Sequence, residues 1–424
     1  MILPLIAIFF VLSMVRFPIA LSIAMAVAIA IGFFSNLSMF VLVQRLVVGI
    51  DSFVYLAIPL FIMAGRLMNA GGITDRIFDL ARAMVGHMRG GLGHANIVAS
   101  MIFSGMSGSA VADAGGLGLI EIKAMNDQGY PKSFSGAVTV ASSVIGPIIP
   151  PSIPMVLYGA LAEVSVGRLF LGGIIPGILV GLGLMILVSV ISHIRNYPKD
   201  DPVNFAEFAR RFSRALLPGL TPVIIIGGIL GGIFTPTEAA AVAVIYAFLI
   251  SYFVYHTICL SDLPSLVLET MITTAVVTFV ISAASSFSYL LIISNVADAL
   301  SSLLLSITGN RFLLLLILNL AMLLFGCVME AGVAMILLVP ILVPVLNIVG
   351  IDLVHFGVVM TINLMIGVAT PPIGMSLFVV SHVAEIPVEQ LMRSILIFLV
   401  PPMAVLFLVT YIPVLVTWIP GLFF

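Results

Sequence analysis

The chain has 424 residues, of which 62% are hydrophobic and 8% are charged, and its formal net charge is −2. Soluble domains carry about 25% charged residues, so this composition excludes an ordinary soluble domain, and without a Lys/Arg patch no nucleic-acid partner is expected. The mean hydropathy of +1.32 instead predicts an all-α polytopic membrane protein in a lipid bilayer, since long uniform apolar runs do not suit a β-barrel.

Residues 1–90 predict N-terminal scaffold spans and a surface arm helix. Each crossing takes roughly 20 residues, so about ten crossings and some shorter hairpins fit the whole length. Apolar residues begin at Ile2 without a basic segment or a small-residue cleavage site, which indicates an uncleaved span. The predicted elements are apolar spans at 2–15, 18–35 and 52–70, a turn at Arg16, Phe17 and Pro18, an interfacial helix at 38–50, and an amphipathic surface helix between Asp75 and His87.

The segment 91–166 predicts a hairpin followed by a broken helix. From Gly90 to Met125 the chain is too rich in glycine for one span, yet long enough to enter and leave the membrane on the same side. We expect a re-entrant helical hairpin with its tip near Ser107 to Gly116. The next helix is expected to break at Gly146 to Pro151 and to resume near Ile153.

The second half repeats these breaks in one register. Gly326 follows Gly105 by 221 positions, Gly367 follows Gly146 by 221, and Pro371 follows Pro150 by 221. Apolar segments interrupted at matching places in two halves indicate the substrate and ion site of a secondary transporter. The predicted division is scaffold spans at 167–310 with a hydrophilic linker at 195–214, a second hairpin and broken helix at 311–382, and a C-terminal span at 383–424.

The basic residues predict the orientation. On this topology twelve Lys and Arg residues fall on one side and three on the other, so the positive-inside rule places the twelve in the cytoplasm and both termini outside it. The two hairpins then enter from opposite faces, which makes the halves inverted repeats. The twelve are Arg16, Arg76, Arg82, Arg89, Lys123, Lys132, Arg195, Lys199, Arg210, Arg211, Arg214 and Arg393, and the three are Arg45, Arg168 and Arg311.

Helix breaks inside a membrane free backbone groups that hydrocarbon cannot satisfy, so each break must line a cavity or hold an ion. Backbone carbonyls and hydroxyls are hard ligands suited to Na⁺, and half-helix N-termini attract an anion. Each hairpin tip is expected to meet the break of its own half, unless Gly and Ser only permit close helix packing. The candidate ligands for two or more Na⁺ ions are Ser104, Gly105, Ser107, Gly108, Gly146, Pro147, Gly326, Val328, Met329, Glu330, Gly367 and Thr370.

Ionisable residues inside spans are costly and usually functional. Asp113 follows the first tip and Glu330 the second, where each either holds an ion or caps a helix. Glu238 follows a Thr-Pro pair and predicts an N-terminal cap. Arg66 is expected to extend its side chain to the membrane interface rather than to pair with an acid.

The motifs around these breaks resemble the large, DctM-like membrane subunit of tripartite ATP-independent periplasmic (TRAP) transporters. They cover nearly the whole chain and are specific in combination. The residues that carry the resemblance are Gly105–Asp113 (GMSGSAVAD), Gly146–Ser152 (GPIIPPS), Thr235–Ala240 (TPTEAA), Gly326–Glu330 (GCVME) and Thr370–Gly374 (TPPIG).

The resemblance implies an elevator-type importer of the bacterial inner membrane that couples uptake of an organic acid to Na⁺. A periplasmic substrate-binding protein would deliver the acid, and a small membrane subunit is expected as a separate chain. The resemblance places Ser107 at the first Na⁺ site and Glu330 beside the second, where many members have Asp. It places Ser109 and Ser152 near the substrate, and we add Asp113, Pro150 and Pro151 as candidate substrate contacts.

The Ser- and Gly-rich site region lacks an arginine clamp, which favours a hydroxyl-rich monocarboxylate such as sialic acid over a C4-dicarboxylate. Three other hypotheses stay open. They are a self-sufficient divalent-anion:Na⁺ symporter, an intramembrane enzyme that uses Asp113 and Glu330 as a carboxylate pair, and a structural subunit without ion sites. Because no membrane-embedded catalytic motif is present, we expect a protein that is not an enzyme.

Overall fold

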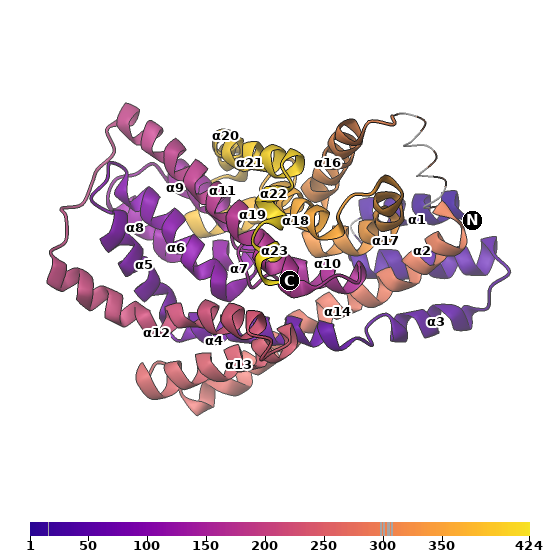
Figure 1. Cartoon of the computed structure of the whole chain (residues 1–424), viewed down its shortest axis with the longest axis horizontal. Helices are drawn as coiled ribbons and strands as arrows, with labels where there is room; N and C mark the ends of the chain where they lie inside the picture. Colours follow the sequence, from indigo (N-terminus) through magenta and orange to yellow (C-terminus); the bar gives the residue numbers. More distant parts are fainter. Residues whose placement is uncertain (16, 297–298, 300–301, 303–305, 307) are drawn as a thin grey trace.

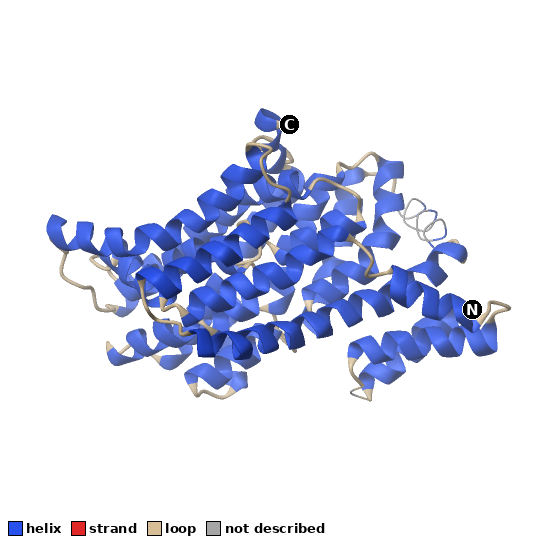
Figure 2. Ribbon diagram, turned by 90° about the horizontal axis from the view of Figure 1, so that it is seen from below, coloured by secondary structure: helices blue, strands red, loops and turns tan. Residues whose placement is uncertain are grey.

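The computed structural model describes residues 1–15, 17–296, 299, 302, 306 and 308–424. Within these residues all regular structure is helical, which confirms the all-α class. The long helices lie side by side along the molecule's longest axis, with the N-terminus at one end and the C-terminus near the middle (Figures 1 and 2). The predicted turn at Arg16 falls outside the described residues, as does part of the predicted segment 167–310.

The N-terminal region forms helices where apolar spans were predicted. Helices α1 and α2 pack against each other, and both α2 and α3 pack on α14. The α3–α14 contact is fixed by the Arg45 guanidinium, 3.9 Å above the centre of the Tyr289 ring, and by a hydrogen bond from the Ser282 hydroxyl to the Leu46 carbonyl. The bounds are α1 Ile2–Met14, α2 Ile19–Phe34, α3 Met39–Val48, α4 Ala57–Ala70, α5 Ile73–Val85 and α14 Leu263–Ile293.

Two stretches share one pattern of helices at the predicted spacing. The first limb of each hairpin ends at Ser107 and Val328, and 328 − 107 = 221. The next limb begins at Ala110 and Ala331, again 221 apart. The first stretch holds α6 Gly91–Ser107, α7 Ala110–Gly115, α8 Leu117–Asp127, α9 Lys132–Ser143 and α10 Ile153–Leu161, and the second holds α16 Arg311–Val328, α17 Ala331–Val349, α18 Leu353–Val368 and α19 Met375–Ala384.

The non-helical tips of the two hairpins are shorter than predicted, and the second tip begins a few residues later than predicted. The first tip is only Gly108 and Ser109, and Gly116 merely separates α7 from α8. Gly326 and Gly367 lie in the last turns of α16 and α18, so the second tip is only Met329 and Glu330. The Pro150–Pro151 and Pro371–Pro372 peptide bonds are both cis.

Long helices connect and follow the two stretches. The predicted linker at 195–214 is wrong in its second part, because Asn204 caps a helix that begins at Phe205, and only residues 196–204 lie outside helices. The last predicted span bends by 46° between two helices. These elements are α11 Val166–Arg195, α12 Phe205–Leu230, α13 Pro236–Leu249, α20 Val388–Phe398, α21 Val400–Tyr411, α22 Val414–Thr417 and α23 Pro420–Phe423.

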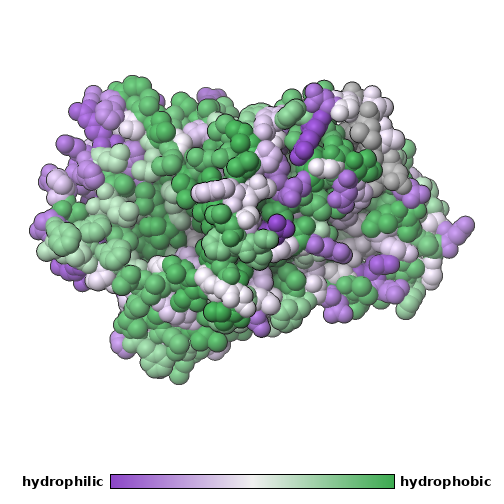
Figure 3. All heavy atoms as spheres, in the orientation of Figure 1, coloured by the Kyte–Doolittle hydropathy of each residue, from purple (hydrophilic) through white to green (hydrophobic). Residues whose placement is uncertain are grey.

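In the described residues seven helices are long and apolar enough to cross a membrane, or eight if α20 and α21 form one bent span. The remaining apolar helices, such as α1 and both halves of the second broken helix, are shorter than a full crossing. Apolar side chains cover most of the face in Figure 3, and hydrophilic ones gather at the end that carries α5, α8 and the linker. The surface is that of a multi-pass membrane protein.

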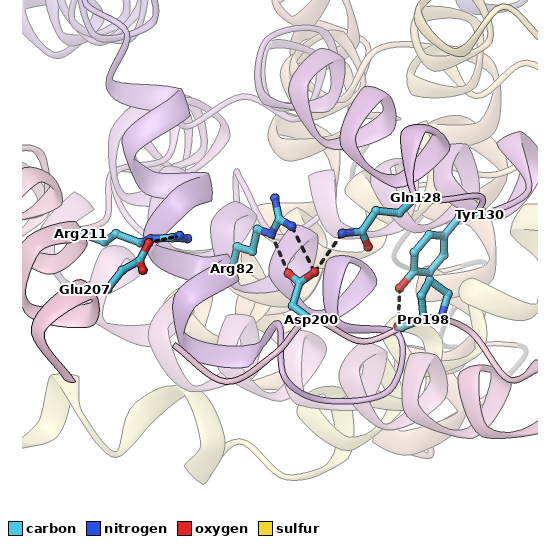
Figure 4. Close-up of polar contacts among 7 residues, drawn as sticks. All are labelled: Arg82, Gln128, Tyr130, Pro198, Asp200, Glu207 and Arg211. Atoms are coloured by element: carbon cyan, nitrogen blue, oxygen red, sulfur yellow. Dashed lines mark hydrogen bonds and ion pairs between the residues drawn. The ribbon is translucent and has the colours of Figure 1, made fainter. Parts of the chain in front are cut away.

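The linker residues 196–204 hold the base of the first hairpin (Figure 4). Asp200 accepts two hydrogen bonds from the Arg82 guanidinium of α5, at 2.6 and 3.1 Å, and one of 2.9 Å from Gln128, which follows α8. The Tyr130 hydroxyl donates to the Pro198 carbonyl at 3.1 Å. One short linker therefore ties the surface helix to the end of the hairpin's second limb.

Candidate functional site

In the first half the hairpin tip lies on the break of its own broken helix. The Ile153 N–H, at the start of α10, donates to the Gly108 carbonyl over 3.4 Å. A Cβ added to Gly146 would lie 3.6 Å from the Ser109 backbone, and one added to Gly108 would lie 2.8 Å from the Pro151 carbonyl oxygen. The predicted meeting of tip and break in this half is present.

The second half makes the equivalent contact more tightly. A Cβ added to Gly367 would lie 2.5 Å from both the Cα and the carbonyl carbon of Gly326, so α16 and α18 touch backbone to backbone. The Gly374 N–H, just before α19, donates to the Cys327 carbonyl over 3.4 Å. Gly105, the counterpart of Gly326, instead faces Pro222 of α12.

Contacts between the halves close the arrangement. The second limb of each hairpin packs on the resumed part of the other broken helix, α7 on α19 and α17 on α10. A Cβ added to Gly115 would lie 3.5 Å from the Val379 side chain, and one added to Gly332 would lie 3.4 Å from the Leu157 side chain. The start of α10 lies on the first tip, beside the start of α7, and the start of α19 lies on the end of α16, beside the start of α17. Each half thus places two helix N-termini, which favour an anion, beside its own break.

The serines at the first break differ in what their hydroxyls contact. Ser109 and Ser152 occupy the N-cap positions of α7 and α10, and each accepts a backbone N–H three residues ahead. Ser152 also donates to the Pro147 carbonyl, and Ser104 donates to the Met101 carbonyl at 2.7 Å. The Ser107 hydroxyl is buried and meets no hydrogen-bond partner among the described residues. Of these serines Ser107 alone holds an unused oxygen beside the break.

The second break offers fewer side-chain oxygens. The Thr370 hydroxyl donates a hydrogen bond of 2.6 Å to the Ile366 carbonyl. Glu330 is exposed at the N-cap position of α17, where its carboxylate lies near Gly332 but makes no capping hydrogen bond. Met329 is buried in extended backbone, and the Val328 side chain points outward with 54% of its surface exposed.

Proline removes helical donors at the first break. Pro147, Pro150 and Pro151 carry no N–H, so the carbonyls of Ser143, Gly146 and Pro147 lose their helical donors. The Ser143 carbonyl accepts instead from the Gly146 N–H, and the Pro147 carbonyl accepts from the Ser152 hydroxyl. Gly146, Pro147, Pro150 and Pro151 are all buried, as expected for backbone that lines a site inside protein. The described residues contain no group of three or more His, Cys, Asp or Glu side chains that could hold a metal ion. Carbonyl and hydroxyl oxygens are the ligands that remain.

The structure adds buried polar groups to those that the sequence pattern indicates. Asp113, a predicted site residue, is 2% exposed, and Glu121, two turns further along the limb, is 1% exposed without being predicted. Asn96 donates to Thr139 at 2.8 Å and accepts from Ser142 at 2.7 Å, which joins α6 to α9. An acid inside the apolar run around Glu121 was the available signal.

Two other sequence predictions have definite outcomes. Glu238 and Thr235 form a reciprocal capping box at the start of α13, which confirms the predicted cap. The expectation for Arg66 is wrong, because its guanidinium pairs with Glu269 and donates to the Thr273 hydroxyl at 2.9 Å. Arg66 lies on α4 and its partners on α14, so the pair joins two helices, and a charge in an apolar helix is stabilised by a nearby partner.

Comparison with known proteins identifies relatives along most of the chain. Residues 6–415 match the family described as "Tripartite ATP-independent periplasmic transporter, DctM component". The chain is 47% identical over 380 residues to the sialic acid TRAP transporter large permease protein SiaM of Vibrio cholerae, covering 90% of this chain and 89% of that protein. It is 42% identical over 379 residues to the sialic acid TRAP transporter permease protein SiaT of Haemophilus influenzae, covering 89% of this chain and 62% of SiaT.

Among solved structures, the chain resembles the YdaH transporter of Alcanivorax borkumensis with a TM-score of 0.60. The superposition covers 91% of this chain and 90% of that one at 15% sequence identity. At this identity the likeness concerns the fold, which is that of a membrane transporter. The intramembrane-enzyme hypothesis is not supported, since the matched family and its relatives are transporter permeases.

Proposed function

Because the chain belongs to the DctM family and is a TRAP transporter large permease subunit, we propose that it imports sialic acid by coupling its uptake to Na⁺. The observation that carries the Na⁺ proposal is the unused Ser107 hydroxyl, buried at the end of α6 next to the proline-rich break. Hydroxyl and backbone carbonyl oxygens suit a hard monovalent cation better than a transition metal.

The substrate is proposed to lie at the half-helix N-termini beside the breaks. Ser109 and Ser152 cap two of these helices, so their hydroxyls stand beside N–H groups that an acid's carboxylate can accept from. Asp113, Pro150 and Pro151 lie in the same two segments and stay candidate contacts. A hydroxyl-rich monocarboxylate fits serine- and glycine-lined backbone, and two relatives are named as sialic acid transporters. C4-dicarboxylate is the competing substrate.

Movement is proposed to follow an elevator mechanism. The hairpins and broken helices at 91–166 and 311–382 pack on one another across the two halves, so they form one body that can move together. The segments 1–90, 167–310 and 383–424 are proposed as the scaffold and its arms. A periplasmic binding protein would supply the substrate and a separate small membrane subunit would complete the assembly, in a bacterial inner membrane with both termini on the periplasmic side.

Uptake of labelled sialic acid into proteoliposomes tests this proposal, with the small subunit and the binding protein present. An inward Na⁺ gradient should drive uptake, excess succinate should not compete, and Ser107→Ala should weaken the dependence on Na⁺. Ser135→Ala is the matched control, because Ser135 is also a buried helical serine but bonds the Pro131 carbonyl away from the breaks. Uptake without a binding protein would favour the self-sufficient symporter, and uptake indifferent to Na⁺ would contradict the proposal.

A further inference from the structure

The second limb of the first hairpin carries two buried carboxylates, of which Asp113 is a candidate substrate contact and Glu121 belongs to no proposed site. Asp113 lies in α7 and Glu121 in α8, and their exposed fractions are 2% and 1%. Both Asp113 oxygens and Oε1 of Glu121 find no partner of hydrogen-bond geometry among the described residues, although the Ser100 hydroxyl lies near Asp113. A buried ionised carboxylate without partners is strongly unfavourable.

No salt bridge joins Asp113 or Glu121 to a basic side chain in the part of the chain that the structure describes, and Lys123, on α8 itself, is exposed. α8 packs against α5, α6, α7, α9 and α19. Arg82 is paired with Asp200, and Lys132 lies 3.8 Å from Glu385 at the other end of α9. The titratable and charged side chains on the packed helices are Asp75, Arg76, Asp79, Arg82, His94, Asp113, Lys132 and His382, with Glu385 just after α19.

We infer that Asp113 and Glu121 form a buried proton-binding site, in which Glu121 stays protonated and the pair never carries two negative charges. Two like charges in a poorly solvated interior repel, so protonation of one of the two acids lowers the cost of burying both. The inference does not depend on the proposed substrate or on Na⁺ coupling.

A proton fits this place better than a metal cation does. Na⁺ requires several oxygen ligands, which the helix breaks supply through free carbonyls. Glu121 lies inside α8, an unbroken helix of 11 residues whose backbone groups are engaged in the helix itself. Gly118, one turn earlier, faces the methyl group of Thr139. A protonated Glu121 would also leave one charge fewer inside the hairpin.

Thermal unfolding of the purified subunit between pH 5 and pH 9 tests the proton site without any transport assay. An acid that is neutral in the folded protein but ionises on unfolding near pH 4.3 makes unfolding easier as the pH rises. The unfolding temperature of the wild type should therefore fall across this range. Glu121→Gln, which imitates the protonated acid in shape, should fold and should remove most of this fall. The exposed control Glu163→Gln should keep it.

Three results would overturn the inference. The first is an unfolding temperature whose pH dependence is the same in E121Q as in the wild type. The second is an E121Q protein that does not fold, because a glutamine should replace a protonated glutamate without loss. The third is loss of stabilisation by added Na⁺ in E121Q, which would make Glu121 a Na⁺ ligand. Failure of the Na⁺ proposal gives a different result. In that case Ser107→Ala would leave the Na⁺ dependence of uptake unaltered, and the pH dependence of the unfolding temperature would still distinguish E121Q from the wild type.

Discussion

At the scale of single residues, the hydroxyl groups at the first break have separate tasks. Ser109 and Ser152 hold the ends of half-helices in place, whereas Ser107 holds a free oxygen. A cap is worth about 1 kcal/mol of stability wherever it occurs. Caps at the site therefore contribute to folding and to binding at once, and the two contributions can be separated by comparison with a cap elsewhere.

Ser152→Ala should lower the free energy of unfolding by about 1 kcal/mol and should also reduce substrate uptake, because α10 loses its cap at the site. Ser165→Ala is the control, since Ser165 caps α11 in the same manner at an exposed position. Thermal unfolding and uptake are measured for both. Equal uptake by the two variants would show that the start of α10 does not take part in binding.

Gly367 lies in the closest backbone contact of the second half. Gly367→Ala should destabilise the protein by about 1–3 kcal/mol, because a methyl group cannot fit against the Gly326 backbone and the two helices must separate. A methyl group added at Gly219 in α12 would have no neighbouring atom within 4 Å, so Gly219→Ala should leave the stability unchanged or slightly raised. An unfolding temperature for Gly367→Ala equal to that of the wild type would show that α16 and α18 can separate freely.

At the scale of elements, the sequence anticipated the breaks but not what surrounds them. Gly and Pro at a constant spacing of 221 positions carry a local signal, since each one limits helix formation where it stands. The Arg66–Glu269 pair joins residues 203 positions apart, and no local pattern predicts such a partner. The start of α12 was missed because its polar residues resemble a loop, although Asn204 caps it.

At this scale we predict how the linker at 196–204, which Asp200 holds in place, responds to pH and to substitution. Partial burial alone would raise the pKa of Asp200, but hydrogen bonds from Arg82 and Gln128, with the Arg82 and Arg211 charges, lower it below its ordinary value. The contribution of Asp200 is therefore present above about pH 3.9 and is lost as the pH falls through the lowered pKa. At pH 7, Asp200→Ala should accelerate hydrogen exchange in residues 196–204.

Asp201→Ala is the matched control for this linker. Asp201 is exposed, and the hydrogen bonds from Arg82 and Gln128 go to Asp200 and not to Asp201. Exchange in 196–204 should stay slow in that variant. Equally fast exchange in both variants would attribute the order of the linker to its backbone hydrogen bonds with Gly86 and Gly90 instead.

At the scale of the whole molecule, everything proposed for the site depends on how the two halves are inserted. Matching helices, tips that touch their own breaks, and second limbs that pack across the halves make one connected unit. Hairpins that enter from opposite faces bring their tips together within the membrane, where half-helix N-termini can meet an anion. Hairpins that enter from the same face would not give alternating access by this route.

Side-specific labelling of single cysteines measures this insertion directly. Asp127→Cys at the base of the first hairpin and Gly309→Cys at the base of the second are both exposed, and Cys259→Ser removes the exposed native thiol. A membrane-impermeant maleimide should label position 309 in intact cells with a permeabilised outer membrane, and position 127 only in inverted vesicles. Labelling of both positions from the same side would contradict the inverted arrangement on which the account rests.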